Sequence, residues 1–79
     1  MKINLSESNK KILDKYRIDY KSYIDREITR EEYELSFIDS IDELIVSYRD
    51  EEGEPLKEWL ELEKVRDEIY ITNWKDLTK

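Results

Sequence analysis

A capping box at residues 29–32 is the feature that most constrains how this chain can fold. Thr29 is followed three residues later by Glu32, so its hydroxyl can accept the backbone N–H of Glu32 while the glutamate carboxylate accepts the backbone N–H of Thr29. Ile28 and Tyr33 stand at the two positions of a hydrophobic staple. One helix must therefore end just before Thr29 and another must start there. So short a connection predicts an antiparallel helical hairpin.

Apolar residues at helical spacing extend on both sides of this box. The first stretch predicts a helix over residues 6–26, capped by Ser6, with an apolar stripe formed by Ile12, Tyr16, Tyr20 and Tyr23. Ile18 falls on the polar side of that helix and is an exception to the pattern. The second stretch predicts a helix over residues 30–49, with a stripe formed by Tyr33, Phe37, Ile41, Leu44 and Tyr48.

The rest of the chain predicts one more helix and an ambiguous tail. Pro55 suits the first position of a helix, which we expect over residues 55–67. Residues 68–79 can continue this helix. Alternatively, residues 69–72 can form a short terminal strand pair with residues 2–5, because both segments are rich in strand-forming residues or alternate in polarity. We expect an all-α protein, a small three-helix bundle built on the antiparallel hairpin.

The composition excludes several kinds of chemical site. Residues 1–79, which we expect to form a single domain, contain no Cys and no His, so disulfides, thiolate zinc sites and the commonest general base are excluded. A single Gly cannot build a phosphate-binding loop. If Glu32 were the last ligand of a calcium-binding EF-hand loop, Lys21 and Tyr23 would stand where oxygen ligands are needed. We therefore expect no metal, no cofactor and no enzymatic activity.

No stretch of the chain has the character of a membrane or export segment. The longest apolar run is three residues, at 44–46, and residues 1–5 lack the apolar stretch of a signal peptide. We expect a cytoplasmic protein with no membrane partner. The absence of Ala, together with many Ile, Lys and Tyr residues, indicates an AT-rich coding sequence of bacterial or phage type.

Negative charge is concentrated in one segment of the chain. Residues 31–54 hold ten acidic residues and one basic residue, within a chain whose net charge is −7. The carboxylates that would share nearly one azimuth on an unbroken helix are those of Glu32, Asp39, Glu43 and Asp50. Apolar residues beside them, off the core stripe, are Leu35, Ile38 and Val46, which either seat the third helix or contact a partner. With Trp74 as a further exposed anchor in the polar tail, these residues form the predicted partner-binding surface.

This surface favours a small regulator, inhibitor or antitoxin-like partner that occupies a basic surface of another protein. A purely structural alternative is that the acidic helix packs beside the basic first helix and its outer carboxylates are only solvated. Two functional alternatives remain. One is a nucleic-acid mimic of phage type that blocks a DNA- or RNA-binding enzyme, and the other is a homodimer with a structural task. Because the chain is acidic overall, we expect no direct binding of nucleic acid.

Overall fold

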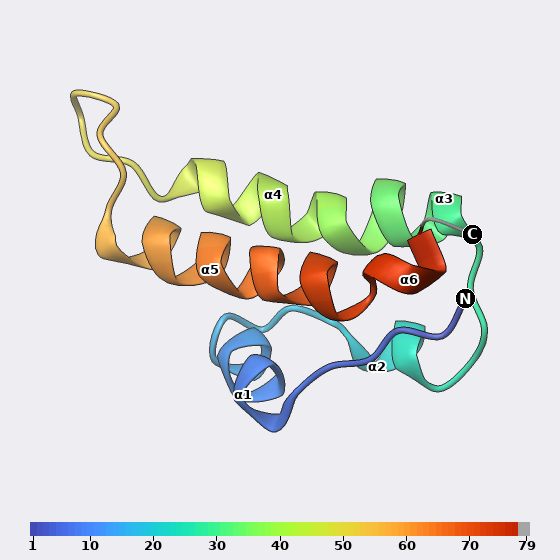
Figure 1. The fold of residues 1–79 in the computed structure, drawn as a ribbon. Coiled ribbons are helices and arrows are strands. Elements are labelled where there is room, and N and C mark those ends of the chain that lie inside the picture. The colour runs from blue at the N-terminus through green and yellow to red at the C-terminus, as the bar shows by residue number, and fades with distance from the viewer. Residues whose placement is uncertain (78–79) are drawn as a thin grey trace.

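Two long helical runs lie side by side in opposite directions and form the longest part of the molecule (Figure 1). The computed structural model describes residues 1–77. Its elements are α1 (Glu7–Lys15), α2 (Lys21–Ile24), α3 (Arg30–Glu32), the π-helical segment η1 (Tyr33–Ile38), α4 (Asp39–Ser47), α5 (Lys57–Thr72) and α6 (Trp74–Leu77). One long run is α3, η1 and α4 in succession, and the other is α5. The described residues contain no strand, which confirms the all-α class.

The antiparallel pair is formed by different segments from those predicted. The capping box is present: the Thr29 hydroxyl accepts the backbone N–H of Glu32 at 3.0 Å, and the Glu32 carboxylate accepts that of Thr29 at 3.5 Å. A helix starts at Arg30, as expected. The helical run that starts there packs against α5, however, through its α4 part. The second and third expected helices therefore form the antiparallel pair. The segment before the box, residues 25–29, is not helical.

The prediction of one helix over residues 6–26 is wrong, because the chain turns sharply after Lys15. Arg17 adopts a left-handed conformation with φ of 57°, and its N–H donates to the carbonyl of Asp14 at 3.0 Å. The N–H of Ile18 donates to the carbonyl of Leu13 at 2.9 Å. These two bonds form a Schellman motif, which satisfies carbonyls at the end of α1. The turn moves Ile18 from the polar side of a continuous helix into the core, where it is 9% exposed.

A π-helical turn interrupts the second expected helix and changes which residues face the core. In η1 the hydrogen bonds span five residues, so one extra residue is accommodated. Side chains after it are rotated by about 100° relative to a continuous α-helix. Phe37 and Ile38 are both buried, with exposed fractions of 0% and 2%. Ile38 therefore packs in the core, which corrects the expectation that it contributes to a partner-binding surface.

The third expected helix is longer than predicted, and the terminal strand pair does not form. Residues 69–72 belong to α5, which runs to Thr72. Residues 2–5 nevertheless lie against this end of α5, where Asn73 Oδ1 accepts the N–H of Asn4 at 2.8 Å and Asn73 Nδ2 donates to its carbonyl at 3.1 Å. The buried amide of Asn73 thus supplies the pair of hydrogen bonds that a neighbouring strand would supply. Residues 78 and 79 of the expected tail lie outside the described residues.

A shared hydrophobic core joins the N-terminal third of the chain to the helix pair. Its buried members are Ile3, Leu13, Ile18, Tyr20, Ile28, Tyr33, Phe37, Ile38, Ile41, Ile45, Leu62, Val65 and Ile69. The first segment is also held to residues that follow α2, because the N–H of Ile28 donates to the carbonyl of Met1 at 2.8 Å. Within the described residues, no helix has the length and apolar character needed to cross a membrane.

Candidate protein-interaction site

The outward side of α4 carries two of the predicted carboxylates, those of Asp39 and Glu43. Both are exposed and lie one turn apart, about 6 Å along the axis at the helical rise of 1.5 Å per residue. Neither carboxylate makes a hydrogen bond or an ion pair with any residue of the described chain. Leu35 and Val46 flank them along the run, with exposed fractions of 71% and 51%. Leu35, Asp39, Glu43 and Val46 form what we term the acidic face.

Glu32, a third predicted carboxylate, is engaged within the molecule. Its Oε2 accepts from Arg26 Nη2 at 2.8 Å, and its Oε1 completes the capping box with Thr29. The hydrogen bond from Arg26 is the main reason why the pKa of Glu32 lies below its usual value. The π-helical turn also rotates Glu32 away from the azimuth of the later carboxylates. Glu32 therefore caps a helix and is not part of the acidic face.

Asp50, the fourth predicted carboxylate, lies beyond the end of α4 in a loop that projects from the helix pair (Figure 1). Its Oδ1 accepts the backbone N–H of Glu52 and of Glu54, both at 2.9 Å, and so fixes the turn. Gly53 completes the turn with φ of +86°, a conformation that suits glycine. The exposed carboxylates of this loop belong to Glu51, Glu52 and Glu54. We term residues 50–54 the acidic loop.

Trp74, the predicted aromatic anchor, is exposed but belongs to a different part of the surface. It lies on α6 with an exposed fraction of 60%. With Asp67, Tyr70 and Ile71 it lines an open, largely apolar hollow of about 610 Å³. None of these residues belongs to the acidic face, so the structure does not bring Trp74 together with Asp39 and Glu43.

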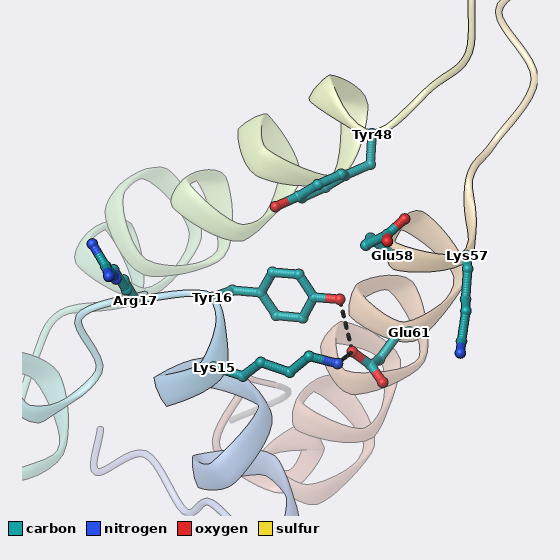
Figure 2. A pocket seen from close by; sticks show the side chains of 7 residues that line it. All are labelled: Lys15, Tyr16, Arg17, Tyr48, Lys57, Glu58 and Glu61. Carbon is teal, nitrogen blue, oxygen red and sulfur yellow. Dashed lines mark hydrogen bonds and ion pairs between the residues drawn. The ribbon is translucent and has the colours of Figure 1, made fainter.

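A second hollow, which sequence reasoning did not find, opens between α1, the end of α4 and the start of α5 (Figure 2). This ring pocket has a volume of about 370 Å³ and is lined by Lys15, Tyr16, Arg17, Tyr48, Lys57, Glu58 and Glu61. The rings of Tyr16 and Tyr48 meet edge to face, with centroids 5.7 Å apart and an interplanar angle of 71°. The Tyr16 hydroxyl donates to Glu61 Oε1 at 2.7 Å, and Lys15 Nζ donates to the same oxygen at 2.9 Å.

The protonation states in the ring pocket follow from these contacts. Burial, and then the hydrogen bond to Glu61, raises the pKa of the Tyr16 phenol above its usual value. Hydrogen bonds from Lys15 and Tyr16 hold the pKa of Glu61 below its usual value. At neutral pH the phenol is therefore a donor and Glu61 is ionised. The sequence offered one signal for this site, since an apolar stripe ends at Tyr48 and another includes Tyr16. It did not indicate that α1 packs against α5, where the two rings meet.

The carboxylates of these sites do not cluster in the number that a metal ion needs, within the part of the chain that the structure describes. Within residues 1–77, no three acidic side chains gather closely enough to hold a cation. Comparison of the chain with family models, with curated proteins and with solved structures finds no match. The acidic face, the acidic loop and the ring pocket are therefore interpreted from their own chemistry.

Proposed function

We propose that this protein is a small acidic, non-enzymatic protein-binding module, a regulator, inhibitor or antitoxin-like partner that occupies a basic surface of a target protein. The observation that carries the proposal is the state of Asp39 and Glu43. Both carboxylates are exposed, both are without an intramolecular partner in the described chain, and both lie between the exposed side chains of Leu35 and Val46. Exposed carboxylates complement a basic partner surface, and the apolar side chains beside them supply area that can be buried at contact.

Association would begin with long-range attraction. Residues 31–54 hold ten acidic residues against one basic residue, and their field steers a basic surface toward α4 and the acidic loop. The apolar side chains of Leu35 and Val46 would then be buried at contact, each contributing about 1.5–3 kcal/mol at full burial. Steering governs the association rate, whereas these anchors govern how long the complex lasts.

The test is a double charge reversal on the acidic face. Asp39→Lys with Glu43→Lys should abolish the capture of partner proteins from an extract of the source cell and leave the far-ultraviolet circular dichroism unchanged. The matched control, Asp25→Lys with Glu27→Lys, changes the net charge equally at exposed positions away from α4 and should retain capture. Equal capture by both double variants, with the same proteins recovered, would contradict the role of the acidic face.

Salt and competing nucleic acid separate this function from its alternatives. Partner binding through exposed carboxylates should weaken steeply between low and moderate salt, because screening shortens their reach to about 10 Å at 0.1 M. A homodimer held by apolar side chains would instead persist in sedimentation experiments across that range. A nucleic-acid mimic further requires that DNA or RNA compete for the groove that the captured partner offers. Of the four carboxylates expected along one line, α4 carries only Asp39 and Glu43.

A further inference from the structure

One half of the ring pocket already holds a cation. Lys15 Nζ lies 5.3 Å from the centroid of the Tyr16 ring and 2.9 Å from Glu61 Oε1. An ammonium in this position is attracted by the electron-rich face of the ring and by the carboxylate together. The position of Lys15 therefore shows that the walls of the pocket accept a positive charge.

The other half of the pocket also offers an aromatic ring and a carboxylate. It is formed by the half-buried ring of Tyr48 and by the carboxylate of Glu58, which lies beside that ring on the first turn of α5 (Figure 2). Neither the Glu58 carboxylate nor the Tyr48 hydroxyl makes a hydrogen bond or ion pair with another residue in the range 1–77. An aromatic face and a carboxylate with no cation between them are thus left at the pocket mouth.

The basic residues that line the pocket do not supply that cation. Arg17 points away from the two rings, and Lys57 extends beside Glu61 (Figure 2). Lys15 is already paired with Glu61. The hydrogen bond from Leu56 N–H to the Tyr48 carbonyl at 3.0 Å holds the start of α5, and with it Glu58, close to Tyr48. The carboxylate of Glu58, unpaired within residues 1–77, therefore favours a cation over an anion beside Tyr48.

We propose that the ring pocket binds the side chain of an arginine from a basic partner protein, with the guanidinium stacked on Tyr48 and paired with Glu58. This inference rests on the proposed function and identifies the residue type that the module takes from its target. A guanidinium suits the site better than an ammonium, because it is planar, stacks on aromatic faces and can pair with a carboxylate through two N–H groups. The volume of about 370 Å³ lies in the range of small-ligand pockets.

The probe for this proposal is Nα-acetyl-arginine methylamide, titrated into the full chain and followed by the NMR signals of the tyrosine rings. We expect saturable shifts confined to the ring pocket. Glu58→Gln should weaken binding about fivefold or more, because a charge-assisted pair is lost while the shape is kept. The matched control, Glu27→Gln, removes the same charge from an exposed position outside the pocket and should bind the probe as the native chain does.

Two further comparisons test the chemistry of the site. Tyr48→Leu keeps apolar bulk but removes the ring face, and should weaken the arginine probe about threefold. The corresponding lysine probe should bind the native chain about threefold more weakly than the arginine probe. The proposal is overturned by shifts that spread over all the tyrosine rings, by an equal response of the Glu58→Gln and Glu27→Gln variants, or by a lysine probe that binds as tightly.

The double reversal at Asp39 and Glu43 separates this inference from the proposed function. That variant keeps the ring pocket and should bind the arginine probe normally while it loses the partner. If the double reversal leaves partner capture intact and the probe still binds the pocket, the proposed function alone fails. If Glu58→Gln leaves probe binding unchanged while the double reversal abolishes partner capture, the arginine pocket alone fails.

Discussion

At the scale of single residues, the backbone of Arg17 decides where the first helix ends. A left-handed conformation costs a residue with a side chain about 1–2 kcal/mol. The chain adopts it at φ of 57° because the turn places Ile18 beside Leu13 in the core. Ile18 was the exception in the helical pattern, so the sequence contained a signal that the helix stops early. Glycine is the usual residue at this position of such a turn, so the arginine in the sequence did not indicate that a turn forms there.

Replacing this arginine should stabilise the protein. Arg17→Gly should raise the free energy of unfolding by about 0.5–1 kcal/mol, since the relief of left-handed strain exceeds the extra freedom that glycine gives the unfolded chain. Urea unfolding measures the change. The control is Lys11→Gly at an exposed position within α1, which should lose about 1 kcal/mol. A loss of stability in Arg17→Gly would contradict the assignment of strain.

At the scale of elements, the capping box was predicted correctly, whereas the packing partner of the helix that follows it was not. The capping box at Thr29 was predicted because all its hydrogen bonds lie within four residues. The choice of packing partner for α4 depends on contacts with α5, which no local pattern reports. The same distinction holds at the candidate site. Asp39 and Glu43 were found because they lie on regular helix, whereas the ring pocket needs residues brought together from three elements.

The π-helical turn accommodates one extra residue in the second helical run, and this yields a test. Deleting the exposed Ser36 would place the buried residues at the α-helical spacings of three, one, three and four, namely Tyr33, Phe37, Ile38, Ile41 and Ile45. We expect this variant to fold cooperatively, with a cost in the free energy of unfolding of about 2 kcal/mol or less. Circular dichroism at 222 nm during urea unfolding measures it.

The control for this deletion is the removal of Glu43, an exposed residue in the regular part of α4. There the loss of one residue turns Ile45 about 100° away from the core, because each residue of an α-helix adds that angle. Exposing a buried isoleucine should cost about 3 kcal/mol or more once the cavity it leaves is included. Equal destabilisation by the two deletions would show that η1 does not hold an extra residue.

At the scale of the whole molecule, Glu61 joins the α1 layer to the helix pair. One carboxylate oxygen accepts from Lys15 and from Tyr16, so a single ionised group on α5 holds the end of α1. These bonds lower the pKa of Glu61 below 4.5 in the folded chain. The stabilisation is therefore present above pH 4.5 and is lost as the pH falls through the lowered pKa.

The pH dependence of stability should report this link. Glu61→Gln should be less stable than the native chain at pH 7, and the difference should shrink as the pH falls below the normal value of 4.5. Thermal unfolding at a series of pH values measures it. Glu27→Gln, at an exposed carboxylate that makes no ion pair with the described residues, should follow the native curve throughout. A constant difference between Glu61→Gln and the native chain from pH 7 to pH 3 would contradict the role of its charge.

The projecting loop at residues 50–54 has a consequence for how such a chain can evolve. All its residues are exposed, and its turn is fixed by its own hydrogen bonds and not by the core. Doubling the length of a flexible loop costs only about 0.6 kcal/mol in closure entropy. Insertions in this loop would leave α1 and the helix pair undisturbed. Selection can therefore lengthen or shorten this loop, and with it the distance over which the molecule reaches a target, without changing the fold.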